Sequence, residues 1–517
     1  MALSKAFINA LQDVLGPEYV SDDPVITTSY AFPFHKDCLP PPCFDAIALP
    51  KSTEEVQAIV KLCNSFGFQY KASSTGWLYC DPAGPGCVKI DLRRMNRIIE
   101  INEKSMYAVV EPYVTGGQLQ AELMKRGLNC NLNGAGANCS GMPLAAHVGL
   151  GHLSQSGSYS ERNQLALEWV TGDGEIVKLG SLGSVGEWFS ADGPGPSLRG
   201  LVRGDQTPLG GLGVYTKAAV KIYHWPGPYT FPMEGKSPKY YVKEENIPEN
   251  FLVRYYSFKT LEDLVTAVLK ASEAEIATEL MVFNPSMMAA NMATQNIEEE
   301  IALFNEFKKT MQGPGFMILI AGNSKADFAY KKHVMEQIVA EHDGMSLAPV
   351  EDPVNQGGFI WRYFRETCSI KETGRVQTEI CGSVGGTDSF TLISEFIRKV
   401  NAFKLKAIKE GKLYDDGGMP FMQPTEHGHL AHGETLCKIA LSVKGEEKLR
   451  MHQEFFDLGH QLCIDEHLGL PQDIWNDHSH DHMGPHTDNY HVWLRKLKKT
   501  FDPNGASESS TYITPIE

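Results

Sequence analysis

The sequence predicts an α+β protein with more than one domain, and three observations lead to this prediction. Apolar residues recur at helical spacing in residues 50–66, where Ser52 or Thr53 is a suitable N-cap. Asp173-Gly174 separates two short strand-like runs and predicts a hairpin turn in which both residues have positive φ. After residue 250, β-rich runs alternate with amphipathic helical runs, which is typical of a sheet covered by helices.

The composition is typical of a large globular protein. The 517 residues exceed what one core holds, so two or three domains are expected, and 42% hydrophobic with 21% charged residues is ordinary. The net charge of −16 argues against nucleic acid and against anionic membrane as the main partner. No apolar run reaches about 18 residues, so no membrane span is expected. Eleven scattered cysteines without a C-x-x-C pair predict free thiols, a cytoplasmic location and no iron–sulfur cluster.

The elements follow a recognisable order along the chain. A strand and turn at residues 69–77 and strands at 87–92 and 107–111 precede a helix that begins near Thr115. A glycine-rich segment (131–163), the hairpin, a glycine-dense stretch and a strand at 214–223 follow. The Pro/Gly-rich residues 225–238 mark the clearest boundary. Beyond it we expect strands at 251–258 and 315–322, and helices at 260–274, 298–311, 326–341 and 389–410.

This series resembles the FAD-binding domain of the vanillyl-alcohol oxidase / p-cresol methylhydroxylase (PCMH) family, and the stretch from Gly172 to Gly227 resembles the second half of that domain. The resemblance implies a two-subdomain PCMH-type FAD-binding domain at residues 1–228. It also implies an antiparallel-sheet substrate (cap) domain covered by helices at 229–455, and a C-terminal segment, 456–517, that returns to the FAD domain. The ending Asp502-Pro503-Asn504-Gly505 is recurrent in the family.

Backbone and hydroxyl donors without bulk suit the FAD pyrophosphate. By resemblance that role belongs to Ser73, Ser74, Thr75, Gly76 and Trp77. The family often has a flavin-attaching histidine in or near this loop; none is present, so FAD is expected to be non-covalent. The remaining cofactor residues implied by the resemblance are Gly141, Gly151, Gly204, Gly210, Gly213 and Val214. An ordinary glycine-rich loop is the alternative for residues 204–213.

An arginine for a substrate carboxylate is expected in the segment WRYFRE. In the hydroxy-acid dehydrogenases of the family, an arginine in a similar Trp-x-x-Arg-Glu context has this role, and a planar guanidinium suits it. Arg365 precedes Glu366 and is the closer match, with Arg362 second. The alternative is a surface helix with salt-bridged arginines.

The segment EHGHLAHGE resembles a family motif whose two histidines bind a divalent metal beside the flavin. The second motif histidine is Leu436 here and the motif Asn is Glu434, so His427, His432 and Glu434 are the possible substitutes beside His429. We expect His427 and His429 to alternate on a strand, with a Zn, Fe or Mn site formed by His429, His432, Glu434 and Glu466.

Asp465-Glu466-His467-Leu468-Gly469 resembles the family's Glu-His-Gly-x-Gly, whose histidine can act as base. His467, His429, Glu466 and Arg365 are therefore the predicted catalytic residues, because imidazole suits removal of a hydroxyl proton near neutral pH. The histidine-rich residues 476–491 indicate either a metal-rich loop at the active site or, more simply, a solvated surface loop.

The resulting hypothesis is an FAD-dependent dehydrogenase that oxidises a small organic molecule, a 2-hydroxy acid first. Oxidation of a para-alkylphenol or aromatic alcohol is the second hypothesis, for which Tyr159, Tyr363 and Tyr414 are available without a matching motif. A redox-neutral synthase of the ether-lipid type and an FAD-bearing electron-transfer subunit are further alternatives. An electron-acceptor protein and a second copy of the chain are the expected partners.

Overall fold

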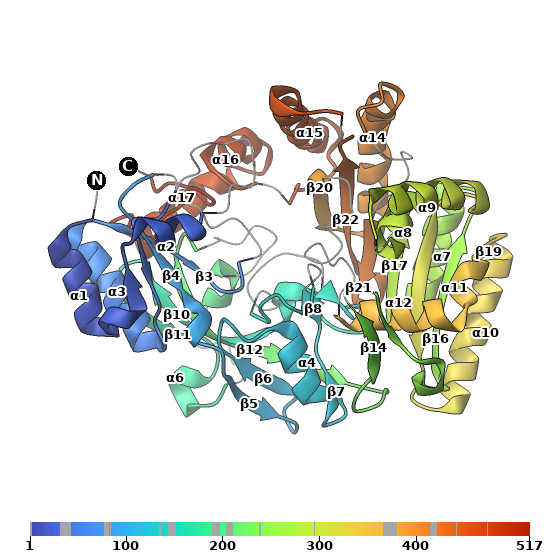
Figure 1. The fold of residues 1–517 in the computed structure, drawn as a ribbon, viewed down its shortest axis with the longest axis horizontal. Coiled ribbons are helices and arrows are strands. Elements are labelled where there is room, and N and C mark those ends of the chain that lie inside the picture. The colour runs from blue at the N-terminus through green and yellow to red at the C-terminus, as the bar shows by residue number, and fades with distance from the viewer. Residues whose placement is uncertain are drawn as a thin grey trace.

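The structure of the chain is a computed structural model. It describes residues 3–516 apart from 32–42, 77–81, 83, 134–135, 143–150, 189–196, 203–209, 237–238, 294, 366–379, 414–420, 441 and 473. Two smaller sheets formed by the first half of the chain lie beside one large sheet formed by the second half (Figure 1). The last helix of the chain lies back beside the N-terminal elements, so the two chain ends are neighbours in Figure 1.

The first sheet has four strands in the order β1-β2-β4-β3. Its core strands β2, β4 and β3 are parallel, and β1 is antiparallel to β2. Ser52 Oγ accepts from the Glu55 N–H at 3.3 Å, which starts the predicted helix α3, and Val56 and Ile59 of that helix are fully buried. The elements are α1 (Lys5–Leu15), β1 (Val20–Ser21), β2 (Ala46–Ala48), α3 (Thr53–Phe66), β3 (Gln69–Ser73) and β4 (Cys87–Asp91).

The second sheet is antiparallel, in the order β11-β10-β12-β6-β5. Its strands are β5 (Ile98–Asn102), β6 (Tyr107–Val110), β10 (Gln164–Thr171), β11 (Ile176–Lys178) and β12 (Gly213–Lys221), and α4 (Gly116–Met124) packs on it. The predicted hairpin joins β10 and β11, but only Gly174 has positive φ, +91°. Gly174 N–H donates to Thr171 O and Thr171 N–H to Glu175 O, so the connection is a three-residue loop, not the predicted two-residue turn.

The large sheet has seven antiparallel strands in the order β19-β16-β18-β17-β21-β22-β20. They are β16 (Phe251–Ser257), β17 (Glu279–Phe283), β18 (Gly315–Ala321), β19 (Met345–Ser346), β20 (Ile380–Asp388), β21 (Phe421–Thr425) and β22 (Leu430–Lys438). Alternate residues of β16 enter two different cores: Leu252 and Tyr256 face one, Val253 and Tyr255 the other. The antiparallel sheet covered by helices is therefore confirmed.

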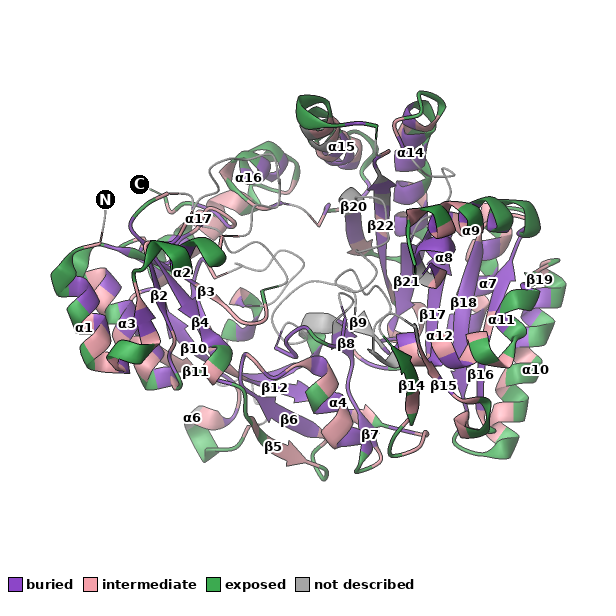
Figure 2. Ribbon diagram, in the orientation of Figure 1, coloured by how far each residue is buried: buried purple, intermediate pink, exposed green. Residues whose placement is uncertain are grey.

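Both faces of the large sheet are covered, and Figure 2 shows its strands buried between helices with exposed outer sides. One face carries α7 (Leu261–Glu273), α10 (Lys325–Glu341), α14 (Phe390–Lys409) and α15 (Gly445–Glu466). The other carries α8 (Pro285–Met292), α9 (Ile297–Thr310), α11 (Ala348–Glu351) and α12 (Pro353–Arg365). We call the face with α7, α10, α14 and α15 the helix face. The opposite face is called the site face, because the candidate functional site lies on it.

The chain end returns to the N-terminal sheets through α17 (Tyr490–Phe501), which follows α16 (Asp477–Met483). Tyr70 N–H of β3 donates to Ala506 O, and Glu508 N–H donates to Tyr70 O, both at 2.9 Å. Since α15 still packs on the helix face through Phe455 and Cys463, this return lies after the predicted boundary at residue 455.

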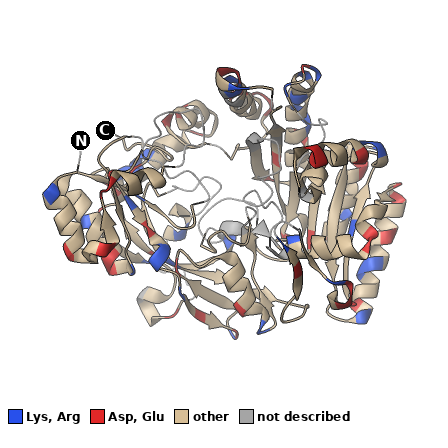
Figure 3. Cartoon of the chain, viewed as in Figure 1, with Lys and Arg blue, Asp and Glu red and all other residues tan. Residues whose placement is uncertain are grey.

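The remaining elements are short. Among the described residues they are the strands β7 (Leu128–Asn129), β8 (Leu132–Asn133), β9 (Gly151–His152), β13 (Tyr223–His224), β14 (Met233–Lys236) and β15 (Lys239–Val242), the helices α2 (Pro24–Ser29) and α6 (Leu182–Val185), and seven 3₁₀ turns. Lys, Arg, Asp and Glu residues lie mainly on the outer helices and loops, whereas the strands of the large sheet carry few of them (Figure 3). Among the described residues, no helix combines the length and the apolar character that a bilayer crossing requires.

Candidate functional site

A chain of four polar side chains joins the N-terminal half of the molecule to the large sheet. Tyr159 OH lies 3.0 Å from Thr387 Oγ1, which lies 3.1 Å from His432 Nδ1. His432 Nε2 lies 2.8 Å from Glu434 Oε1. The sheet positions the last three, because Thr387 of β20 is directly opposite His432 of β22, and Glu434 is two residues further along the same strand.

These side chains point to the site face of the sheet. A Cβ on Gly433, between His432 and Glu434, would meet Ile393 Cγ2 of α14 at 2.3 Å, so its neighbours point away from the helix face. His432 is fully buried, and its ring centroid lies 6.4 Å from that of Phe421. The Glu434 side chain keeps 21% of its surface exposed. The pair thus has one buried member and one that reaches solvent.

The network assigns the protons. A carboxylate only accepts, so His432 Nε2–H donates to Glu434, and in the neutral imidazole Nδ1 then accepts from the Thr387 hydroxyl. The Thr387 oxygen is left to accept from the Tyr159 hydroxyl. The three hydrogen bonds that link Tyr159, Thr387, His432 and Glu434 therefore run in one direction, from the Tyr159 hydroxyl to the carboxylate. This direction suits transfer of a proton to the imidazole.

Glu426 makes a second connection between the same two parts of the molecule. Its carboxylate accepts from Tyr159 N–H at 2.8 Å and pairs with Arg162 Nη1 at 2.7 Å. The backbone N–H of Glu426 donates to Ser154 O, and that of His427 donates to Gln155 O. Sequence reasoning missed Glu426; its place at the start of the histidine-containing segment was the only available signal.

A third connection is the buried carboxylate of Glu279 on β17. It accepts from Leu153 N–H, from Gln423 Nε2 at 2.7 Å and from its neighbour Leu280 N–H at 2.9 Å. Tyr363 of α12 is fully buried nearby, and burial, reinforced by the Glu279 charge, raises the pKa of its hydroxyl well above the usual range. Residues 153–162 are thus attached to two strands of the large sheet, β20 and β17, and to the turn between β21 and β22.

The predicted strand through His427 and His429 is wrong. Residues Glu426–Gly428 form a tight turn in which His427 has φ +55°, and β22 begins only at Leu430. His429 is exposed, whereas His432 is buried. In the described part of the chain, no group of three or more His, Cys, Asp or Glu side chains could hold a metal, so His429, His432, Glu434 and Glu466 are not brought together.

The predicted C-terminal acid and base lie on the helix face. Glu466 ends α15 and pairs with Lys399 of α14 at 2.5 Å, and His467 is an exposed left-handed C-cap with φ +53°. They are separated by the sheet from His432. Residues 477–483 form helix α16, with His480 buried, and so are not the predicted loop. Arg362 is buried in α12, while the Arg365 side chain and Glu366 lie outside the described residues.

At the N-terminal sheets, the residues after β3 present donors. Within the described part of the chain, the N–H groups of Ser74, Thr75 and Gly76 donate to no other residue, and Gly76 has φ +71° with open space where a Cβ would be. Thr75 Oγ1 accepts from Ser140 N–H at 3.0 Å, and Gly141 N–H donates to Val114 O. These donors on a chain without bulk fit a phosphate. Ser73 is the last residue of β3.

Other predicted cofactor residues have partners inside the protein. A Cβ on Gly213 would lie 2.1 Å from Val170 O, so this glycine is required by the packing of β12 on β10. Val214 is buried in the core of the first sheet. Gly210 O accepts from Ser507 Oγ. Gly151 pairs with Asn133 through β9, and Trp77 and Gly204 lie outside the described residues.

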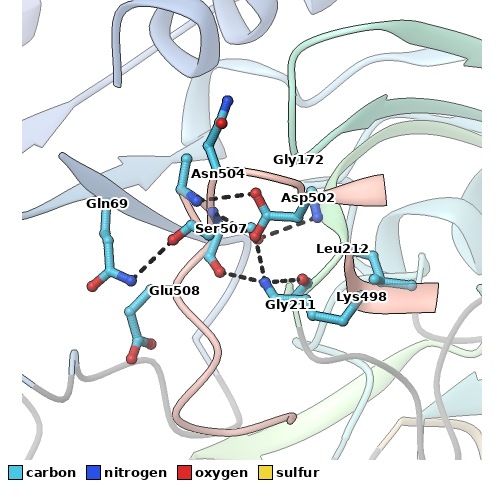
Figure 4. A network of polar contacts seen from close by, with 12 residues as sticks. Gln69, Gly172, Gly211, Leu212, Lys498, Asp502, Asn504, Ser507 and Glu508 are labelled. Atoms are coloured by element: carbon cyan, nitrogen blue, oxygen red, sulfur yellow. Dashed lines mark hydrogen bonds and ion pairs between the residues drawn. The ribbon is translucent and has the colours of Figure 1, made fainter. Parts of the chain in front are cut away.

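The chain end holds the 210–213 turn in place, as Figure 4 shows. Lys498 Nζ donates to Gly211 O at 2.5 Å, to Ser507 O at 2.7 Å and to Asp502 Oδ2. Asp502 also accepts from Ala506 N–H and Ser507 N–H at 3.0 and 3.1 Å. Both ion-pair side chains are fully buried. This C-terminal clasp (Lys498, Asp502 and Ser507) explains physically why the Lys and Asp-Pro-Asn-Gly ending is present.

A family model described as "FAD binding domain" matches residues 44–180. The chain contains an FAD binding domain. The matched range begins before β2 and ends after β11, so it covers most of the first two sheets and includes the donors of residues 74–76. These donors fit the phosphates of FAD, as the chemistry of an N–H and hydroxyl set requires. The covalent or non-covalent state of the flavin stays a prediction.

Similar sequences include two dehydrogenases and one dehydrogenase subunit. They are a probable mitochondrial D-lactate dehydrogenase of Danio rerio (25% identical over 61% of this chain), a D-2-hydroxyglutarate dehydrogenase of Stutzerimonas stutzeri (29% over 43%), and the flavoprotein subunit of 4-cresol dehydrogenase of Pseudomonas putida (30% over 29%). The matched segments span 55%, 46% and 30% of these relatives' own lengths, about half or less.

Solved structures match over nearly the full chain. A 4-ethylphenol oxidase of Gulosibacter chungangensis has a TM-score of 0.74 at 18% identity, covering 99% of this chain and 97% of its own. p-Cresol methylhydroxylase has a TM-score of 0.72 at 14% identity, covering 98% and 96%. At these identities the likeness concerns the fold, and it confirms the predicted combination of an FAD-binding domain with an antiparallel-sheet domain.

Proposed function

We propose that the protein is an FAD-dependent dehydrogenase that oxidises a small organic alcohol, with a 2-hydroxy acid as the first substrate class. The observation that supports this most is the one-directional hydrogen-bond chain from Tyr159 to Thr387, His432 and Glu434. It links Tyr159, which lies within the residues matched by the FAD binding domain model, with the large sheet. The similarity to D-lactate and D-2-hydroxyglutarate dehydrogenases supports the substrate class.

Alcohol oxidation requires removal of a hydride and a proton. Bound FAD would supply the two-electron acceptor, with residues 74–76 holding its phosphates. The side chains of the protein must accept the proton. His432 Nδ1 accepts it through the Thr387 hydroxyl. The resulting imidazolium is stabilised by Glu434, whose Oε1 lies 2.8 Å from Nε2. We therefore assign the base to His432, in place of the predicted His429 and His467.

A para-alkylphenol or aromatic alcohol is the second candidate substrate. It is favoured by the 30% identity to the 4-cresol dehydrogenase flavoprotein subunit and by the buried hydroxyls of Tyr159 and Tyr363 near the site face. In this case an electron-acceptor protein would be the natural partner. The same imidazole would accept the phenolic or alcoholic proton, so the two candidates differ in substrate and share His432.

Anaerobic mixing of the FAD-loaded protein with separate panels of 2-hydroxy acids and para-alkylphenols tests the proposal. Loss of the oxidised-flavin absorbance with a hydroxy acid supports the first candidate, and loss with an alkylphenol alone supports the second. If neither panel reduces the flavin, while a chemical reductant does, the proposed dehydrogenase activity is wrong and an electron-transfer subunit becomes the better account.

A further inference from the structure

Tyr159 is held by the large sheet at both of its ends. Its hydroxyl lies 3.0 Å from Thr387 Oγ1, and its backbone N–H donates to Glu426 Oε1 at 2.8 Å. The two partners come from different places, since Thr387 lies on β20 and Glu426 begins the turn between β21 and β22. A residue fixed at its main chain and at its side-chain tip has little freedom left, and Tyr159 keeps only 1% of its surface exposed.

The turn that presents Glu426 has a costly backbone. Glu426 and His427 have φ of +49° and +55°, in the left-handed region where a non-glycine residue is strained. Gly428 follows with φ +82°, and a Cβ there would meet Ser272 Cβ of α7 at 2.8 Å. Three successive left-handed residues are maintained by the bonds from Glu426 N–H to Ser154 O and from His427 N–H to Gln155 O. Such a turn is over-determined by contacts to the segment that contains Tyr159.

We infer that Glu426 is a positioning residue for the reaction: its carboxylate fixes the main chain of Tyr159 so that the phenol hydroxyl meets Thr387 and completes the path to His432. The inference rests on the proposed function. The Glu426 side chain is 19% exposed, and among the described residues its partners are Tyr159 N–H and the half-exposed Arg162. Only the bond to Tyr159 is needed for the positioning role, which gives a clear distinction between substitutions.

Four variants separate the two bonds. Glu426→Ala removes both, whereas Glu426→Gln keeps an amide oxygen that can accept from Tyr159 N–H. Arg162→Met removes the ion pair alone, which as a partly exposed pair contributes little. Tyr159→Phe removes the hydroxyl at the far end. Each is measured for flavin content, for the rate of flavin reduction by the substrate that reduces the wild type, and for hydrogen exchange of the peptide that contains the Tyr159 amide.

Glu426→Ala should slow flavin reduction by about tenfold or more, because misplacement of a reacting group by a fraction of an ångström is costly. Flavin content should be unchanged, and Glu426→Gln and Arg162→Met should stay within about twofold of the wild type. Because Glu426 acts through Tyr159, the double variant with Tyr159→Phe should reduce its flavin no more slowly than Tyr159→Phe alone. Multiplied rate losses in the double variant, or a wild-type rate in Glu426→Ala, would overturn the inference.

Hydrogen exchange distinguishes failure of the positioning role of Glu426 from failure of the proposed function. If no substrate reduces the wild-type flavin, the proposed function fails on that result alone. The exchange measurement still applies, because Glu426→Ala should speed exchange at the Tyr159 amide and Glu426→Gln should leave it near wild type. Unchanged exchange in Glu426→Ala would overturn the positioning role independently of any activity.

Discussion

Thr387 and His432 lie directly opposite each other on β20 and β22, with Thr387 Oγ1 3.1 Å from His432 Nδ1. This cross-strand pair is the midpoint of the path from Tyr159 to Glu434. A threonine hydroxyl can accept from one neighbour and donate to the other at the same time, which valine, its near-isostere, cannot do. The pair therefore makes a direct test of whether the path is used.

Thr387→Val should slow flavin reduction by about 10²-fold, within the range of a lost proton-transfer group, and should leave FAD content unchanged. Thr387→Ser keeps the hydroxyl and should restore most of the rate. Stopped-flow reduction with the best substrate measures both. Equal rates for the valine and serine variants would mean that the hydroxyl has no part in the reaction.

The C-terminal clasp should be essential to stability. Lys498→Met leaves Asp502 fully buried without its cation, which costs about 3–5 kcal/mol of unfolding free energy. Lys499→Met, at an exposed neighbouring position, should stay within about 0.5 kcal/mol. Urea unfolding followed by fluorescence of the first two sheets measures the difference. Similar midpoints for the two variants would contradict the role given to the clasp.

Stability should fall in mild acid because of two buried histidines. Burial lowers the pKa of His460 on α15 and of His480 on α16 to about 4. Unfolded histidine has a pKa near 6.5, so between pH 6.5 and 4 the unfolded chain binds more protons and the melting temperature should drop as pH falls. Below about pH 4 the folded state is protonated too, and this contribution levels off.

Replacing both residues, as His460→Gln with His480→Gln, should flatten the melting temperature between pH 6.5 and 4. The exposed His333→Gln serves as the control and should keep the wild-type slope. A double variant as acid-sensitive as the control would show that other groups cause the loss.

Gly213 should tolerate no side chain. Gly213→Ala places a Cβ 2.1 Å from Val170 O at φ +121°, so β12 must separate from β10. Gly67→Ala is the matched comparison, because Gly67 has φ +71° with open space around it and costs only the left-handed strain of about 1 kcal/mol. The Gly213 variant should therefore lose clearly more thermal stability than the Gly67 variant, and equal losses would contradict the packing role.

Most of the fold could be predicted because its elements depend on local patterns. Helix α3 begins at Thr53 because Ser52 caps it, and strand β18 covers Gly315–Ala321, within one residue of the expected range. The hairpin at Asp173-Gly174 was correct in place and wrong in type, since its loop length depends on the β10–β11 register. The FAD-binding domain was identified from the order of these elements together with the loop after β3.

The candidate site is harder to predict from the sequence than the fold, because it is formed by residues that are distant in sequence. His432 and Glu434 were named from their motif, but as metal ligands with His429 and Glu466. The turn at Glu426–Gly428 and the sheet itself separate these groups. Thr387 and Glu426 carry no motif, and they are found only from the pairing of β20 with β22 and from the contacts of Tyr159. Arg365 and its role remain a prediction.

Flavin reduction in a His432→Gln variant tests the central claim most directly. The FAD-loaded wild type and variant are mixed anaerobically with the substrate that reduces the wild type fastest, with His333→Gln as the control. The account predicts full FAD content in all three proteins and reduction about 10²–10⁴-fold slower in His432→Gln alone. Wild-type reduction by His432→Gln, above all if His429→Ala or His467→Ala lost it instead, would contradict the assignment of His432 as the base.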